Sequence, residues 1–516
     1  MIDSTKAPSA VEKTLVLLAV CLAAAAMPLT FTGPAVALSA IGRALSDNPI
    51  ALNWVTNAFM LTFGSSLMAA GALADSYGCR RVFLSGVAAF AILSLGLALA
   101  PGIVWFDLLR AAQGVAAAAA FSGGMASLAQ EFDGPSRVRA FSVVGTSFGV
   151  GLAFGPIASG LMIEAFGWRS IFVLVVGLAV LALGLGGRFV RESRDPNAAG
   201  LDWRGAVSFT LALALLTYGV LQAPERGWSD PLVVGLLLGA ALLFAAFGFI
   251  EQRIAHPMLD LSLFRYPRFV GVQLLAAAPA YAFVVLLILL PIRFVGVEGR
   301  SEIEAGRLMI ALSSPLLILP FTAGLLTRWF APATICGVGL VVAAGGLFWL
   351  AHAPVYDGVS IVPPMATIGV GIGLPWGLMD GLAVSVVPRE RAGMATGIFS
   401  TTRVAGEGVA LAIVTAALST LTASHLSADG ATNVAARAAQ RLVTGDLAGA
   451  TSLLPGVGRA ALVHDYGDAF GVLLLALAAV TLTTAVVVFA FLRRGDARTD
   501  EAEPAPDEQS LCTTEA

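Results

Sequence analysis

Charged residues are scarce in this sequence: Asp, Glu, Lys and Arg make up 12% of its 516 residues, whereas hydrophobic residues make up 58%. A soluble domain carries about 25% charged residues, so this composition leaves too little polar surface for a water-soluble globule. The mean hydropathy of +0.86 points the same way. The sequence therefore excludes soluble enzymes, nucleic-acid-binding proteins and disulfide-stapled domains, and it predicts a chain embedded in the lipid bilayer.

Cysteine and histidine are also rare, and their spacing gives no sign of a metal site. The sequence has four residues of each type, and no two cysteines form a CxxC pair. Zinc ligands usually occur in short paired spacings, and disulfide frameworks belong to short, cysteine-dense chains. We therefore expect no metal and no cofactor. The cysteines are Cys21, Cys79, Cys336 and Cys512, and the histidines are His256, His352, His425 and His464.

Long stretches without charge are abundant. Fourteen stretches of at least eighteen residues contain no Asp, Glu, Lys or Arg. A helix needs about 20 apolar residues to cross roughly 30 Å of hydrocarbon, whereas outer-membrane barrels use alternating segments of about ten residues. The sequence therefore predicts an all-α membrane protein with fourteen transmembrane helices. We place these spans at 14–40, 50–74, 82–101, 104–130, 140–163, 169–188, 204–223, 231–250, 269–292, 306–327, 332–351, 360–387, 393–419 and 468–492.

The distribution of basic residues predicts the orientation of the spans. An even number of spans puts both termini on one side of the membrane. With the termini in the cytoplasm, nineteen Lys and Arg residues lie on cytoplasmic segments and nine on outer segments. Cytoplasmic loops carry an excess of Lys and Arg. We therefore expect a multi-pass protein of the inner (plasma) membrane, with residues 1–13 and a disordered tail at 493–516 in the cytoplasm.

Two cytoplasmic loops repeat at nearly the same offset, which predicts an internal duplication. The pattern Arg-x-Arg-Ala at 137–140 recurs at 389–392, an offset of 252 residues, and the turn at 71–73 recurs at 324–326. Repeated bundles that rock around a central site are typical of secondary transporters. The predicted domains are a six-helix bundle at 14–190, two inserted helices at 201–252, and a second bundle at 269–492. An outer loop at 420–467 lies within the second bundle, and its helical patch is either a small cap or part of a tether.

The loop between spans 2 and 3 combines an acid, two glycines and two arginines. A carboxylate and a pair of guanidinium groups can hold two helix ends together, and glycines let backbones approach. The residues are Gly71, Asp75, Gly78, Arg80 and Arg81. They resemble the G-x-L-A-D-x-x-G-x-R/K-R/K signature of the major facilitator superfamily. The alternative is a helix cap at Asp75, with the arginines acting as topology signals.

Span 4 contains an arginine inside the membrane. Such an arginine is costly unless it has a partner or a water-filled path. Arg110 stands three residues from both Asp107 and Gln113, so the three share one helix face. Residues 110–114 resemble the R-x-x-Q-G motif of the same superfamily, and this resemblance implies a part in coupling to proton movement. The alternative is an Arg110 side chain that reaches outward and pairs with Asp107.

Span 5 carries small residues at every fourth position and a proline. Small residues at this spacing allow close helix packing, and the proline interrupts the backbone hydrogen-bond ladder. Gly151, Gly155, Pro156 and Gly160 resemble the G-x-x-x-G-P-x-x-G-G signature of exporters, with Ser159 in place of one glycine. The resemblance implies outward transport. Packing alone would also account for the glycines.

Two spans of the second bundle contain a carboxylate. Glu407 lies four residues after Arg403 in span 13, and Asp380 lies in span 12. By the internal repeat, Glu407 corresponds to Gly155 and lies in the outer half of the membrane, where the bundles meet. A carboxylate there is costly when ionised, so Glu407 is our candidate proton site and Asp380 a second acid. The alternatives are a static Arg403–Glu407 pair and an interfacial Asp380.

The pattern of the whole chain resembles the fourteen-helix drug:proton antiporter branch of the superfamily (EmrB/QacA type). The resemblance implies the major facilitator fold, with two pseudo-symmetric six-helix bundles plus two inserted helices. One departure concerns span 1, where the family commonly carries an acid in a D-x-T-I-V-N-V-A-L-P pattern. Residues 30–39 read TFTGPAVALS and contain no acid. Because a buried cation needs a compensating carboxylate, neutral or anionic substrates are favoured over cationic drugs.

We therefore expect a proton-coupled antiporter that exports small organic compounds, and not an enzyme. Its expected partners are the substrate, protons and lipid, with the proton gradient as energy source; outer proteins of an efflux system are an open alternative. A dedicated exporter of one endogenous metabolite, such as an antibiotic or siderophore, and a membrane sensor that binds without transport are alternative functions. Candidates for the substrate cavity are Gln113, Phe148, Tyr281 and Trp376.

Overall fold

The computed structural model describes residues 9–46, 48–132, 134–193, 202–254, 261–353, 360–386, 392–426 and 432–493. Within these ranges the chain forms helices and no strand. The helices that precede the insertion are α1 (Ala10–Val36), α2 (Leu38–Leu45), α3 (Pro49–Tyr77), α4 (Cys79–Ala98), α5 (Ile103–Glu131), α6 (Gly134–Phe166) and α7 (Ser170–Phe189).

The inserted pair consists of α8 (Trp203–Arg226) and α9 (Pro231–Glu251). The rest of the chain contains three short segments of other helix types, the 3₁₀ helix η1 (Leu261–Arg265) and the π-helices η2 (Ala280–Val284) and η3 (Ile292–Val297). Its α-helices are α10 (Pro267–Pro279), α11 (Val285–Pro291), α12 (Glu302–Ser313), α13 (Pro315–Leu326), α14 (Pro332–Ala351), α15 (Val362–Trp376), α16 (Met379–Ser385), α17 (Ala392–Leu426), α18 (Thr432–Val443), α19 (Leu447–Leu453) and α20 (Arg459–Arg493).

Local sequence signals set where several helices begin. Ser9 and Glu12 form a capping box at the start of α1, and Ser301 and Glu304 form another at the start of α12. The side chain of Asn48 accepts hydrogen bonds from the first turn of α3, which opens with a proline. These caps satisfy backbone N–H groups that have no partner within a helix.

The membrane spans agree with the expected positions. Twelve of the described helical segments are long and apolar enough to cross a membrane, and α6 adds a thirteenth if its two parts, bent by 44°, form one span. Helix α3 has 29 residues and lies where the second span is expected. At a rise of about 1.5 Å per residue, a helix of this length is long enough to cross the membrane. Each of the fourteen expected spans thus overlaps one helix or a run of consecutive helices, which is consistent with the expected number of spans. The last begins earlier than expected, because α20 starts at Arg459.

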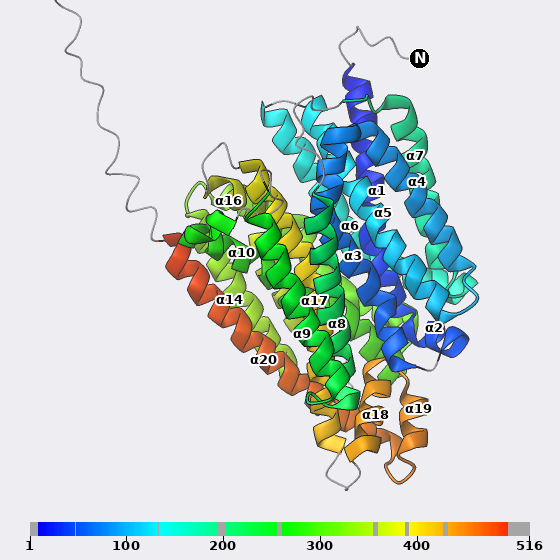
Figure 1. Ribbon diagram of the computed structural model, residues 1–516. Coiled ribbons are helices and arrows are strands. Elements are labelled where there is room, and N and C mark those ends of the chain that lie inside the picture. Colours follow the sequence, from blue (N-terminus) through cyan, green and yellow to red (C-terminus); the bar gives the residue numbers. More distant parts are fainter. Residues whose placement is uncertain are drawn as a thin grey trace, which may run out of the picture.

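The apolar surface of the bundle and the position of its first and last helices are those of a multi-pass membrane protein. Large apolar side chains face outward, among them Ile92, Leu242 and Phe321, which are 70%, 71% and 73% exposed. Figure 1 shows that α1 begins and α20 ends at the same end of the bundle, which we call the terminal end. Helices α18 and α19 lie at the opposite end, which we call the cap end.

The two repeats touch through glycines on two pairs of helices. Gly64 of α3 lies against the backbone of Ala405 in α17, so no side chain fits between these helices. On the other side, a Cβ atom on Gly306 of α12 would lie 2.7 Å from Cα of Ile157 in α6. Toward the terminal end, Gly71, Gly145 and Gly324 have no such neighbour within 4 Å. The repeats therefore approach each other closely at Gly64 and Gly306, and not at these three glycines toward the terminal end.

The described part of the segment between α17 and α20 forms a folded cap. Its helix α18 buries Ala438, Ala439 and Leu442 and packs on α17, α8, α3 and η3. Next to it, the carboxylate of Glu298 accepts hydrogen bonds of 2.8 Å from Nε of both Arg293 and Arg300. The helical patch expected at this position is confirmed, and it is a packed cap rather than a tether.

Candidate functional site

A fully buried arginine organises the centre of the first repeat. Arg110 of α5 has no solvent-exposed surface. Its Nε donates a hydrogen bond of 2.7 Å to the carbonyl oxygen of Val55 in α3, and its guanidinium lies 4.7 Å from the centroid of the Phe59 ring. A cation over an aromatic face is attracted by the electron density of the ring. These contacts hold the Arg110 side chain of α5 against α3, where it does not reach solvent.

Arg110 is the first member of a chain of side-chain hydrogen bonds. Nη1 of Arg110 donates to Oε1 of Gln113 at 2.8 Å, and Nε2 of Gln113 donates to Oγ of Ser94 at 2.8 Å. Ser94 then donates to the carbonyl oxygen of Phe90 within α4. The structure thus brings Arg110 and Gln113 together as their spacing predicts. It adds Ser94 and Phe59, which carry no sequence signal that would have connected them to Arg110.

Glu407 is a buried acid near the middle of α17. Its side chain is 6% exposed, and the next residue, Gly408, lies against Leu61 of α3. Helix α17 also packs on the π-helix η2. A π-helical turn in a long helix often marks a functional position. Arg403, one turn before Glu407 on α17, is partly buried, and its guanidinium lies 5.5 Å from the centroid of the Phe399 ring.

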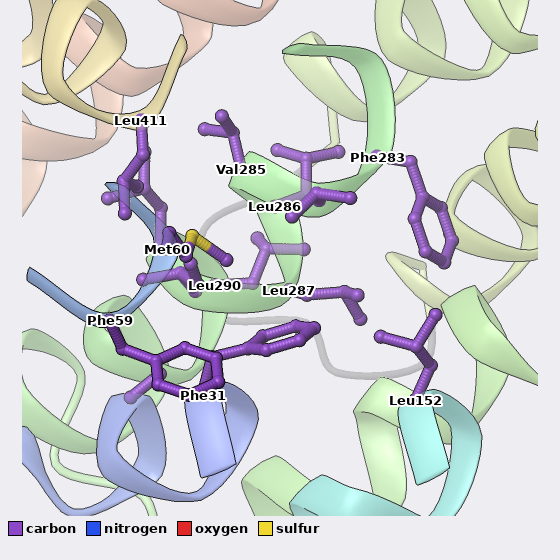
Figure 2. Close-up of a cluster of buried hydrophobic side chains, with 14 of the residues drawn as sticks. Phe31, Phe59, Met60, Leu152, Phe283, Val285, Leu286, Leu287, Leu290 and Leu411 are labelled. Atoms are coloured by element: carbon purple, nitrogen blue, oxygen red, sulfur yellow. The ribbon is translucent and has the colours of Figure 1, made fainter. Parts of the chain in front are cut away.

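An apolar cluster lies where the two repeats face each other. Figure 2 shows Phe31 of α1 and Leu152 of α6 on one side, with Leu286, Leu287 and Leu290 of α11 opposite them. Each of these side chains is at most 2% exposed. Helix α11 lies between the two π-helices η2 and η3. The cluster therefore forms a dry contact between the repeats, carried by a short helix with an irregular turn at each end.

The glycines of the exporter-like motif in α6 make contacts on two sides. Gly151 faces the carbonyl oxygen of Ala25 in α1, and Gly155 faces the hydroxyl of Thr32 in the same helix. A Cβ atom on Gly160 would lie 2.6 Å from the carbonyl oxygen of Glu302 in α12. Pro156 lies inside α6 and has no N–H to donate to the preceding turn. The motif therefore sets the spacing of α6 from α1 and from α12.

The loop between α3 and α4 is fastened to the end of α7. Gly78 ends α3 with a φ of 109°, and the carboxylate of Glu192 occupies the place where a side chain at Gly78 would lie. Nη2 of Arg80 donates a hydrogen bond of 2.6 Å to the carbonyl oxygen of Gly187, and Arg81 approaches Glu192 at 3.4 Å. We call this fastened loop, Gly78 to Arg81, the latch. The sequence alone did not single out its partner Glu192.

Phe148, Tyr281 and Trp376 contact residues other than Arg110. The side chains of Asp75 in α3 and Asp380 in α16 fall outside those the structure describes. Among the substrate-cavity candidates besides Gln113, Phe148 packs edge-on against Phe121 at 6.5 Å, and Trp376 packs edge-on against Phe283 of η2 at 6.2 Å. The hydroxyl of Tyr281 forms a hydrogen bond of 2.6 Å with that of Thr484 in α20.

Comparison with curated proteins gives relatives that share most of this chain. The multidrug resistance protein Stp of Mycobacterium tuberculosis is 31% identical over 382 residues, which cover 73% of this chain and 71% of that protein. The puromycin resistance protein pur8 of Streptomyces alboniger is 32% identical over 410 residues, 77% of this chain and 80% of the relative. The tetracenomycin C resistance and export protein of Streptomyces glaucescens is 28% identical over 400 residues, covering 77% and 74%.

A comparison with solved structures and a match to a family profile agree with these relatives. A bacterial homologue of the human lysosomal transporter Spinster, solved in an inward-facing conformation, superposes with a TM-score of 0.63 at 17% identity and covers 94% of this chain and 98% of its own. The sequence profile of the Major Facilitator Superfamily matches residues 18–411. The chain is therefore a transporter rather than an enzyme, and it belongs to the Major Facilitator Superfamily.

Proposed function

We propose that this protein is a proton-coupled antiporter that exports small organic compounds across the inner membrane, with both termini in the cytoplasm. The cap end then faces outward. The observation that carries the proposal is Glu407, a buried acid on α17 beside the α3–α17 crossing and in a helix that packs on η2. The relatives named for multidrug resistance, puromycin resistance and tetracenomycin export support the direction and class of transport.

Glu407 supplies a physical link between a proton and the arrangement of the repeats. A charged side chain at the centre of a membrane helix costs about 2.5–3.5 kcal/mol, and a protonated carboxyl avoids most of this penalty. A change of that size shifts a two-state equilibrium by about a hundredfold. Protonation of Glu407 therefore favours the state in which the acid is enclosed between helices, and ionisation favours the state in which water or Arg403 reaches it.

The Arg110 network gives the first repeat a fixed polar centre. Its hydrogen bonds join α3, α4 and α5, so these helices move as one body when the repeats rock. The apolar cluster of Figure 2 closes the contact between the repeats without polar partners. Alternating access then requires α11 to separate from Phe31 and Leu152, and the flanking π-helices are the irregular turns at which the chain bends.

The test is transport by Glu407→Gln in reconstituted vesicles, with a substrate found by growing a deletion strain on a panel of toxic neutral, anionic and cationic compounds. We expect the variant to fold and to exchange substrate across the membrane, but not to accelerate efflux when a pH gradient is imposed. The matched control is Glu304→Gln, an acid in the cap of α12 whose replacement keeps a capping side chain. Normal gradient-driven efflux by Glu407→Gln would remove this residue from the mechanism.

A dedicated exporter of one metabolite is the second candidate, because the tetracenomycin relative is named for a single compound. The two candidates differ in the breadth of the growth panel. A drug exporter protects against several unrelated compounds, whereas a dedicated exporter protects against one. Binding of a compound without any transport by the native protein would instead indicate a sensor.

A further inference from the structure

A crevice opens at the cap end between α3, α5 and the inserted helix α8. Its volume is about 380 Å³. Its lining includes Ala51 and Trp54 of α3, Asp107 of α5, and Tyr218, Glu225 and Arg226 of α8. The crevice thus lies between the first repeat and the insertion, apart from the contact between the two repeats.

The floor of the crevice leads to the buried arginine. Asp107 is the fifth residue of α5, and Arg110 lies one turn deeper on the same helix face. Oδ1 of Asp107 is buried and accepts no hydrogen bond from any described residue, and Nη2 of Arg110 is buried and donates none to the described part of the chain. Buried polar atoms are nearly always paired with protein or water. Asp107 lines the crevice, so we expect water that enters the crevice to hydrate its carboxylate.

The inserted helix α8 forms one wall of the crevice. The rings of Trp54 and Tyr218 lie 6.1 Å apart and join α3 to α8. Farther along α8, Nε of Arg226 donates to Oε1 of Gln222 at 3.2 Å, so the positive charge at the rim of the crevice is tied to a side chain one turn earlier on its own helix. Without α8, the carboxylate of Asp107 would face lipid, where a charge is costly.

We propose that this crevice is the outer proton entry of the transporter and that Asp107 is its first proton acceptor, an inference that rests on the proton-coupled function proposed above. A hydronium ion in the crevice transfers one proton to the Asp107 carboxylate, an O–H bond forms on that carboxyl, and the hydronium becomes water. The neutral carboxyl no longer offsets the charge of Arg110. The proton concentration at the cap end therefore acts directly on the Arg110 network, and the inserted helices serve to keep the route wet.

The first experiment measures access and does not depend on transport. In a chain without its native cysteines, Ala51→Cys and Leu108→Cys are treated with a membrane-impermeant methanethiosulfonate reagent from outside intact cells. Leu108 is the neighbour of Asp107 and is 59% exposed on the lipid side of α5, so it is the matched control. We expect labelling at position 51 from the outside and none at position 108. Protection of position 51, or labelling of it only from the inside, refutes the crevice as an outer entry.

The second experiment measures coupling. Native protein in vesicles must first show efflux driven by a pH gradient; if it does not, the proposed function fails before the crevice is tested. We then expect Asp107→Asn to lower gradient-driven efflux by about a hundredfold, the lower range for loss of a proton-transfer group, while substrate exchange without a gradient persists. Asp107→Glu should restore the gradient dependence. The matched control is Glu164→Gln, an exposed acid near the cap end of α6.

Two outcomes would overturn the assignment of Asp107. Equal loss of exchange and of gradient-driven efflux in Asp107→Asn, with no rescue by Asp107→Glu, would make the residue merely structural. Full gradient-driven efflux by Asp107→Asn would show that protons enter elsewhere. Modification of Ala51→Cys provides a third check, because a group that fills the crevice is expected to slow gradient-driven efflux relative to the same variant before treatment.

Discussion

The hydrogen bond between Arg110 and Gln113 predicts how strongly two buried residues of α5 are coupled. Replacing Gln113 with Leu removes the acceptor for Nη1 of Arg110 and the donor to Ser94. A hydrogen bond to a charged group is worth about 1.5–3 kcal/mol in soluble proteins, whereas side-chain bonds between membrane helices average about 0.6 kcal/mol and reach about 1.7 kcal/mol. Because Arg110 is charged and has no exposed surface, we expect Gln113→Leu to lower the free energy of unfolding by about 2 kcal/mol.

A double-mutant cycle isolates this coupling. Arg110→Met loses the same hydrogen bond together with the contact to the Phe59 ring. The double variant is therefore expected to lose about 1.5 kcal/mol less than the sum of the single variants. Unfolding is followed by circular dichroism in mixed micelles while the fraction of denaturing detergent is raised. The expected coupling energy of about 1.5 kcal/mol exceeds the usual additivity error of about 0.3–0.5 kcal/mol, so it can be measured.

The matched control is Thr481→Val in α20, which removes a hydrogen bond of 2.7 Å to the carbonyl oxygen of Leu477 within the same helix. It should add to Arg110→Met without coupling, because the two sites share no partner. A coupling below about 0.5 kcal/mol between Arg110 and Gln113 would refute the network as an energetic unit. Equal coupling to Thr481 would instead indicate a global effect on the micelle-bound state.

The helix contacts give two further predictions. Gly160→Val should lower the free energy of unfolding by about 1–3 kcal/mol and impair transport, because its Cβ would meet the carbonyl oxygen of Glu302. Gly145→Ala should be tolerated, because a Cβ atom there has no neighbour within 4 Å. Equal effects of the two variants in thermal unfolding would contradict the packing role of Gly160. In the latch, Arg80→Ala should lower the free energy of unfolding more than Arg81→Ala, because Arg80 donates a hydrogen bond of 2.6 Å to a backbone carbonyl. The side chain of Arg81 is 79% exposed, and an exposed ion pair is worth about 0–1 kcal/mol. The reverse order in the same assay would show that the exposed ion pair holds the loop.

Features that depend on short stretches of chain could be predicted from the sequence alone. The length of the charge-free runs fixed where helices cross the membrane, because hydrocarbon thickness sets a minimum apolar length. The three-residue spacing of Asp107, Arg110 and Gln113 fixed their common face, because the helix repeats every 3.6 residues. The exporter-like motif of α6 indicated close packing, and its glycines do approach α1 and α12.

Which helices meet, and which side chains complete each site, depends on how the helices pack together. Ser94 and Phe59 join Arg110 from α4 and α3, and Glu192 meets the latch from beyond α7. The sequence does not single out such partners, because membrane helices are apolar on buried and lipid-facing sides alike, so hydropathy does not reveal their neighbours. The sequence did not predict the crevice for the same reason. Its walls come from three helices, and only their packing places α8 beside Asp107.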